Sequence, residues 1–209
     1  MFFFNRNPGL ALPLIALQYH EVKINVLFRK EADLLYGDVV QTAGEDLEAS
    51  LYVDYIFLDT DERRRFAQTS HEILIEQLQH TGPDNGDNSR IRLNYNHPIK
   101  ELVWVVRRKY DNEIITNEGQ KSGLFNFTND LGITSDMSNC PVKHAKLQLN
   151  GHDRMSVRDG TYYNLVQPFQ HHTRVPTKNI FVYSFALKPE EHQPSGTCNF
   201  SRIDNATLD

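Results

Sequence analysis

The sequence predicts an all-β protein with the architecture of a β-sandwich. Short segments in which apolar and polar residues alternate recur along the chain, and clusters of Gly, Pro, Asn and Asp separate them. This is the pattern of about seven short strands joined by turns. No segment shows the sustained 3.6-residue apolar repeat that is typical of a long helix. The chain also contains no internal repeat and no low-complexity tract.

Two segments in the first third predict strands. Glu21–Phe28 alternates strictly between apolar and polar positions, which indicates a half-buried strand. Leu10–Gln18, just before it, is more uniformly apolar, and Pro13 favours a position at a sheet margin. Leu51–Leu58 is apolar on both faces apart from Asp54, so we expect a strand that is covered on both sides.

Two further segments leave alternatives open. Asp59–Gln68 places acids before bases. We favour a solvated charged connection here, and the alternative is a single helical turn begun by Asp59 or Thr60. The apolar residues of His71–Gln79 fit either the face of a short helix or a strand.

A second group of strands is predicted after residue 89. Arg90–Tyr95 and Ile99–Val106 predict two strand regions joined at Asn96–Pro98, and we expect Trp104 to anchor the core. From Asp111 to Val142 the chain shows little periodicity and many Asn, Ser, Thr and Gly residues. A loop of this length in a compact domain usually carries contacts or function.

A hairpin is predicted next. Ala145–Asn150 alternates cleanly, and Asn150–Gly151 is a strong turn signal. Asp159–Gly160 marks another turn. The following stretch, Thr161–Asn179, predicts irregular chain.

The last part of the chain again predicts strand. Ile180–Leu187 forms the strongest strand signal of this half. Pro194–Gly196 indicates a turn. Asn199–Asp204 is then expected to be a strand or arm that pairs with another segment.

Bulk composition restricts the function classes. A chain of 209 residues with 39% hydrophobic and 11% aromatic residues can form one well-packed domain. The net charge is −5, and the basic runs are limited to Arg63–Arg65 and Arg107–Lys109. Direct nucleic-acid binding needs clustered cations and is therefore not expected. No apolar run approaches the ~20 residues of a membrane span, and the N-terminus lacks the pattern of a secretion signal. We expect a soluble protein without membrane insertion.

Cysteine usage and modification motifs agree with a reducing compartment. The two cysteines, Cys140 and Cys198, lie far apart and form no C-x-x-C motif, so we expect free thiols. Asn126, Asn199 and Asn205 begin glycosylation-type triplets. Modification of these sites requires a secretory route, and we expect all three to be unmodified.

The sequence predicts no catalytic, cofactor-binding or metal-ligating residue. The pairs His20–Glu21, His152–Asp153 and His171–His172 are adjacent, and adjacent residues of a strand point to opposite faces, whereas a metal site needs converging ligands. No nucleophile elbow or phosphate-binding glycine loop occurs. Carboxylate pairs such as Glu190–Glu191 lie on expected loops, where we interpret them as solvated.

Four ordered blocks carry a family resemblance. They are PLIALQYHEVKINV, LYVDYIFLDTDERRRFAQ, KLQLNGHDR and SFALKPEEHQPSGTCNFSRIDNATL. In these blocks the chain resembles the major capsid proteins of nucleocytoplasmic large DNA viruses, such as iridoviruses and phycodnaviruses, and in particular their C-terminal jelly-roll domain. The resemblance favours a strand at His71–Gln79.

The resemblance implies a structural protein and not an enzyme. It implies one jelly-roll domain over residues 1–209, similar to the second of the two jelly rolls of the family, with the first jelly roll and the final strand segment absent. It also implies homotrimeric capsomers that tile an icosahedral capsid together with neighbouring capsomers and minor capsid proteins. The protein is then expected in the virion, after assembly in the host cytoplasm.

Three segments are expected to carry the contacts between copies. They are Asp111–Val142, Tyr162–Asn179 and the tail from Gly196, chosen for loop length and by analogy with the family. The alternative function is that of a jelly-roll carbohydrate-binding protein or a metal-dependent, cupin-like enzyme. A minor capsid or vertex component with the same fold is a third interpretation.

Overall fold

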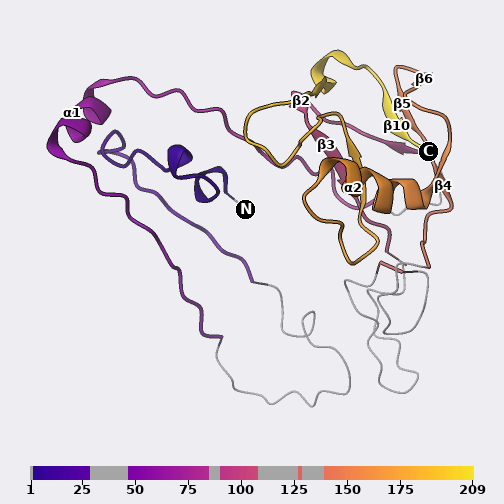
Figure 1. Cartoon of the computed structure of the whole chain (residues 1–209), viewed down its shortest axis with the longest axis horizontal. Coiled ribbons are helices and arrows are strands. Elements are labelled where there is room, and N and C mark those ends of the chain that lie inside the picture. The colour runs from indigo at the N-terminus through magenta and orange to yellow at the C-terminus, as the bar shows by residue number, and fades with distance from the viewer. Residues whose placement is uncertain (1, 29–46, 85–89, 108–126, 129–138) are drawn as a thin grey trace. The chain divides into compact units, whose positions relative to one another are not determined.

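The computed structural model describes residues 2–28, 47–84, 90–107, 127–128 and 139–209, coloured in Figure 1. These residues belong to two compact units. Unit 1 comprises the described residues up to 79, and unit 2 comprises those from 80 onward. Each unit is described on its own.

Unit 1 contains three short helices. They are η1 (Phe3–Asn5), η2 (Pro8–Leu10) and α1 (Thr60–Gln68). Helix α1 begins where it does because Asp59 Oδ1 accepts hydrogen bonds from the backbone N–H groups of Asp61 (3.1 Å) and Glu62 (2.9 Å), which satisfies two donors of the first turn. The favoured expectation of an irregular connection over Asp59–Gln68 is therefore wrong, although its residues are exposed as expected. The alternative of a helix begun by Asp59 is confirmed, and the helix is longer than a single turn. The segment is a nine-residue helix.

The strands expected in unit 1 do not form. Glu21–Phe28, Leu51–Leu58 and His71–Gln79 have no regular secondary structure. Their apolar side chains are largely exposed, as at Val26 (63%) and Tyr55 (67%). A segment with alternating apolar and polar residues forms a strand only where its backbone N–H and C=O groups are hydrogen-bonded to a neighbouring strand. Among the described residues of unit 1, no strand pairs with these segments.

Unit 2 is built mainly from short antiparallel strands. A four-stranded sheet has the order β1-β10-β5-β6, and three two-stranded sheets pair β2 with β9, β3 with β8 and β4 with β7. The bounds are β1 (Ile91–Arg92), β2 (Pro98–Ile99), β3 (Glu101–Trp104), β4 (His144–Ala145), β5 (Leu147–Leu149), β6 (His152–Asp153), β7 (Arg158–Asp159), β8 (Phe181–Ser184), β9 (Cys198–Asn199) and β10 (Ala206–Leu208).

These strands confirm the expected β structure of the second half of the chain. Strands lie within Arg90–Tyr95, Ile99–Val106, Ala145–Asn150 and Ile180–Leu187, although each is shorter than the alternating pattern suggested. The strand or arm expected over Asn199–Asp204 is wrong for most of its length. Only Asn199 belongs to a strand, β9, which pairs with β2, and the chain then forms the short 3-10 helix η6 (Phe200–Arg202). Figure 1 shows β10 beside β5 near the C-terminus.

The predicted hairpin turn is confirmed between β5 and β6. Asn150 (φ 51°) and Gly151 (φ 77°) both adopt left-handed conformations, which a two-residue type I′ turn requires. The side chain of Asn150 also accepts hydrogen bonds from the backbone N–H groups of Asp204 (2.9 Å) and Asn205 (3.2 Å). One residue thus shapes the hairpin and fixes the segment that leads into β10.

The chain after β7 is helical, so the prediction of irregular structure over Thr161–Asn179 is wrong for its first half. A single π-helical turn, η5 (Tyr162–Val166), continues directly into α2 (Gln167–His171). Asp159 begins the segment, because its Oδ1 accepts from the Thr161 backbone N–H (2.9 Å) and hydroxyl (2.7 Å).

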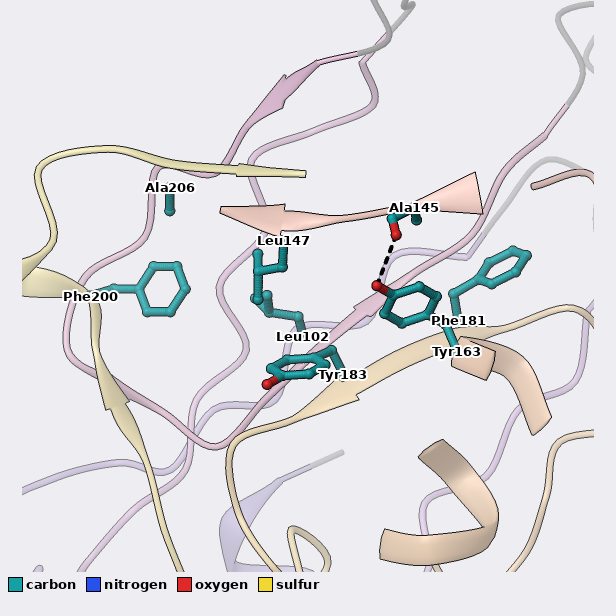
Figure 2. Packing of buried hydrophobic residues seen from close by; sticks show 8 residues of the cluster. All are labelled: Leu102, Ala145, Leu147, Tyr163, Phe181, Tyr183, Phe200 and Ala206. Atoms are coloured by element: carbon teal, nitrogen blue, oxygen red, sulfur yellow. Dashed lines mark hydrogen bonds between the residues drawn. The ribbon is translucent and has the colours of Figure 1, made fainter. Parts of the chain in front are cut away.

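The core of unit 2 is a cluster of side chains from several sheets, with Tyr163 and Phe181 towards one end and Phe200 and Ala206 towards the other (Figure 2). Tyr163 is fully buried, and its hydroxyl donates a hydrogen bond to the carbonyl oxygen of Ala145 in β4 (3.1 Å). Trp104 packs against Tyr163 (ring centroids 5.3 Å apart) and stacks on Phe181 (5.9 Å), which confirms its expected role as a core anchor. The cluster comprises Leu102, Ala145, Leu147, Tyr163, Phe181, Tyr183, Phe200 and Ala206.

Residues 185–196 form a closed loop whose two ends meet, and we call it the 185–196 loop. Ser195 Oγ accepts a hydrogen bond from the Lys188 backbone N–H (2.9 Å). Gly196 adopts φ 150°, and a Cβ atom there would lie 2.7 Å from the Phe185 carbonyl oxygen. Glycine is required at this position because both its backbone conformation and the close approach exclude a side chain.

We predict that Leu147→Ala destabilises unit 2 by about 2–5 kcal/mol, because Leu147 is 1% exposed in the core. The matched control is Leu187→Ala, because Leu187 is 72% exposed and its truncation should change the free energy of unfolding by less than about 0.5 kcal/mol. Urea denaturation followed by tryptophan fluorescence measures both. Equal effects of the two substitutions would contradict the described core.

We predict that Tyr163→Phe changes the alkaline limit of stability. Burial, followed by the neighbouring phenols of Tyr162 and Tyr183, raises the pKa of Tyr163 to about 12. The neutral phenol is thus favoured in the fold, and its contribution is complete below pH ~10 and lost as the pH rises towards 12. At pH 7 the free energy of unfolding of Tyr163→Phe should be about 1 kcal/mol lower than that of the parent chain, because the hydrogen bond is missing. Between pH 10 and 12 the free energy of unfolding of the variant should fall less than that of the parent chain.

The free energy of unfolding between pH 7 and 12 measures this difference. Tyr52→Phe is the control, because Tyr52 is 93% exposed. Parallel pH profiles for the parent chain and Tyr163→Phe would refute the assignment.

Candidate functional site

The three acid–histidine or histidine pairs singled out in the sequence lie in different places. His20–Glu21 belongs to an exposed segment of unit 1, His152–Asp153 forms the exposed strand β6, and His171–His172 ends helix α2. Within the described ranges, no group of three or more His, Cys, Asp or Glu side chains is arranged to hold a metal ion. The expectation of no catalytic, cofactor or metal residue stays a prediction.

His171 and His172 instead connect α2 to other parts of unit 2. His171 Nδ1 donates to the Leu187 carbonyl oxygen (3.0 Å). His172 lies between two carboxylates, with Nε2 3.0 Å from Glu101 Oε2 and Nδ1 3.2 Å from Glu190 Oε1. These contacts join the end of the helix to β3 and to the 185–196 loop.

Glu190 is the residue through which the loop contacts the end of α2. Its second carboxylate oxygen accepts from the Thr173 backbone N–H (3.0 Å). Burial opposes the charged form of Glu190, but the hydrogen bonds from Thr173 and His172 outweigh it and lower the pKa of this carboxyl group. The loop is also held by Lys100, whose Nζ donates to the carbonyl oxygen of Glu191 (2.8 Å).

The helical segment from Tyr162 to His171 exposes an apolar surface. Tyr163, Asn164 and Gln167 are buried on its inner side. On its outer side Leu165 is 40%, Val166 39% and Phe169 77% exposed. We call these three residues the helix patch. Positions three and four apart are neighbours on a helix surface, so these three residues are a candidate contact surface.

Of the three segments expected to carry contacts, Tyr162–Asn179 exposes apolar side chains on a helix surface. The helix patch lies within Tyr162–Asn179. The tail from Gly196 is different, because its apolar residues Phe200 (3% exposed) and Ala206 (3%) belong to the core. Most of Asp111–Val142 lies outside the described residues, as does Asn126, whereas Asn199 and Asn205 are exposed.

Both cysteines are free thiols, as predicted. Burial raises the pKa of Cys140 and of Cys198. Cys140 Sγ also donates a hydrogen bond to the Val142 carbonyl oxygen (3.1 Å). Neither thiol is therefore prepared for nucleophilic chemistry, which depends on the thiolate.

Comparison with known proteins identifies the family. A family model described as large eukaryotic DNA virus major capsid protein matches residues 62–209, and a model described as major capsid protein N-terminus matches residues 1–59. This chain belongs to that capsid protein family. The resemblance carried by the four sequence blocks is thereby confirmed.

Individual capsid proteins are similar along the whole chain. The chain is 53% identical over 231 residues to the major capsid protein of Pyramimonas orientalis virus, covering 99% of this chain and 51% of that protein. It is 47% identical over 234 residues to the major capsid protein of Paramecium bursaria Chlorella virus 1, covering 100% and 52%. The chain thus spans about half the length of these curated relatives.

A solved capsid shares the fold. The structure matches a chain of the quasi-atomic model of the PBCV-1 virus capsid with a TM-score of 0.74 and 40% sequence identity, covering 100% of this chain and 55% of that chain. Among the described residues, no helix is both long enough and apolar enough to cross a membrane.

Sequence reasoning missed the helix patch and the contacts of His172. The apolar spacing of Tyr162, Leu165, Val166 and Phe169 is a helical signal that could have revealed the patch, but Pro168 obscured it. Proline is tolerated at the start of a helix because the first N–H groups have no intrahelical partner. Nothing in the local sequence around His172 signals its contacts, because Glu101 and Glu190 come from distant positions.

We predict that both thiols react slowly in the folded chain. At pH 8 the raised pKa values of Cys140 and Cys198 reduce their thiolate fractions, so a disulfide reagent such as DTNB should modify them at least about tenfold more slowly than in urea. In the Cys140→Ser and Cys198→Ser variants a single thiol remains, so the measured rate of modification belongs to that thiol. Fewer than two thiols in the unfolded, unreduced chain would show a disulfide and contradict the structure.

Proposed function

We propose that this chain is a structural part of the capsid of a large icosahedral double-stranded DNA virus, as a portion of its major capsid protein. The observation that carries the proposal is the 53% identity to a major capsid protein over 99% of the chain. The similarity to a chain of the PBCV-1 capsid supports it. The protein then acts in the virion by folding, pairing and packing against copies of itself.

The proposed fold of unit 2 is a jelly roll. Its short antiparallel strands and the TM-score of 0.74 support this architecture. A single domain over residues 1–209 stays a prediction. The two compact units and the separate family models for residues 1–59 and 62–209 favour a division instead.

The proposed assembly is a homotrimer that contacts neighbouring capsomers and, in addition, minor capsid proteins. The helix patch is the contact surface that we assign to it, because Phe169 is 77% exposed on a helical segment whose inner side is buried. Contacts between subunits bury apolar and aromatic side chains at their centre. The inner side of the same segment is buried through Tyr163, Asn164 and Gln167, so the helix patch is held in place by the core.

The proposal excludes catalysis, direct nucleic-acid binding and membrane insertion for this chain, and it places assembly in the host cytoplasm. No specific observation favours the alternative of a carbohydrate-binding or metal-dependent jelly-roll enzyme. Equilibrium dialysis against zinc or iron tests that alternative, since stoichiometric binding would support it.

We predict that the 209-residue chain forms trimers, measured by light scattering after size exclusion. Alone, the trimer should have three times the 24.2 kDa mass of the chain. Together with a chain that supplies the remaining part of the capsid protein, it should contain three copies of each. Phe169→Asp should weaken this association by at least about tenfold, because it places a charge in an apolar contact. The free energy of unfolding of the chain should change little.

The matched control is Val157→Asp, an exposed residue (58%) of the connection between β6 and β7. It should leave the association unchanged. Strict monomers of the parent chain in both preparations would overturn the assembly proposal. If Phe169→Asp and Val157→Asp weaken trimer association equally, the helix patch is not the contact surface.

A further inference from the structure

His172 is enclosed by acidic groups from two separate elements of unit 2. Glu101 is the first residue of β3, and Glu190 lies in the 185–196 loop. The side chain of His172 is only 14% exposed, against 30% for Glu101 and 41% for Glu190. Because the ring is mostly shielded from water, its contacts with the two carboxylates are screened less than contacts at the open surface.

The chemistry of the ring decides what this arrangement requires. A neutral imidazole has one N–H donor and one lone pair, whereas the imidazolium has two N–H donors. An ionised carboxylate only accepts. In the neutral ring, one nitrogen lone pair therefore faces a carboxylate oxygen at 3.0 or 3.2 Å, which is repulsive. In the imidazolium both contacts are attractive.

The two contacts differ in geometry. The Nδ1 contact with Glu190 is a hydrogen bond, whereas the buried Nε2 atom faces Glu101 at ion-pair distance without hydrogen-bond alignment. This second contact is attractive only when Nε2 carries a proton. The proton that completes the cluster therefore matters for both contacts.

We propose that His172 is a proton-dependent latch that holds the 185–196 loop to β3 when its ring is doubly protonated and weakens that attachment when the ring is neutral. The loop carries Glu190 and the exposed Leu187, so opening of the latch loosens an exposed surface of unit 2. The core cluster does not include these residues.

The other charged groups around the latch keep partners that do not depend on this proton. On α2, His171 donates to a carbonyl oxygen, which a neutral ring can do through a single N–H. Lys100, next to Glu101, donates to the carbonyl oxygens of Glu191 and His192. Lys188 pairs with the carboxylate of Glu191 (3.0 Å), and Arg174 is exposed.

The direction of the pH dependence follows. The latch weakens as the pH rises, because loss of the second ring proton leaves a nitrogen lone pair facing a carboxylate oxygen. At the acidic end, the lowered pKa of Glu190 means that its contribution is complete above the ordinary carboxyl range and is lost only as the pH falls through that lowered value. The attachment is thus strongest at mildly acidic pH.

Hydrogen–deuterium exchange of the 209-residue chain at pH 5.5 and pH 8.0, normalised to intrinsic rates, tests the proposal. Peptides that cover the 185–196 loop should be protected about three- to tenfold more at pH 5.5, while peptides that cover β5 should not change. In His172→Gln the loop should show the same protection at both pH values.

Glu190→Gln provides a second variant. Its carboxamide can accept from or donate to Nδ1, so the contact survives in either protonation state of the ring and the loop should stay protected at pH 8.0. His152→Gln, in the exposed strand β6, is the control and should retain the pH dependence of the parent chain.

Two results would overturn the latch. One is equal loop protection at both pH values in the parent chain, and the other is an undiminished pH dependence in His172→Gln. Loss of protection at β5 in His172→Gln would show that this substitution disturbs the fold. The test of the latch is then the comparison of Glu190→Gln with the parent chain. A pH dependence of loop protection that is retained in Glu190→Gln refutes the proposal.

Discussion

Unit 2 depends on the burial of Tyr163 between the helical segment and the strands. Its strands are only two to four residues long, and three of its four sheets have two strands. Isolated two-stranded pairs of this length are marginal in water. The core cluster that contains Tyr163 draws side chains from β3, β4, β5, β8 and β10, so the sheets share one core and stabilise one another. The hydroxyl bond to Ala145 keeps the one polar atom of this ring satisfied.

The sequence predicted those elements whose information is local. The Asn150–Gly151 hairpin and the strands containing Leu102 and Tyr183 follow from turn chemistry and apolar alternation within a few residues. The strands expected at Glu21–Phe28 and Leu51–Leu58 did not form, because pairing is a property of two segments and alternation within one segment cannot supply the second. The family was recognisable from four sequence blocks, but the surface that we assign to assembly was not.

The helical segment from Tyr162 to His171 combines two roles that usually belong to different elements. Its inner side completes the core, and its outer side presents Leu165, Val166 and Phe169 to solvent. A substitution on the outer side can therefore change association without changing the fold, whereas a substitution at Tyr163 or Gln167 affects both. The two histidines at the end of the segment connect it to the 185–196 loop through hydrogen bonds to Leu187 and Glu190.

The position of β10 in the middle of its sheet bears on how the protein is made. The sheet joins distant parts of the chain, and the ion pair between Arg90 and Asp209 beside it spans 119 residues of sequence. At roughly 5–20 residues per second, the ribosome needs on the order of ten seconds to produce the intervening chain. Until β10 is made, β1 lacks the neighbour that it has in the finished sheet, and so does β5 once it has been synthesised. The growing polypeptide therefore exposes unpaired strand edges that can associate with other nascent chains.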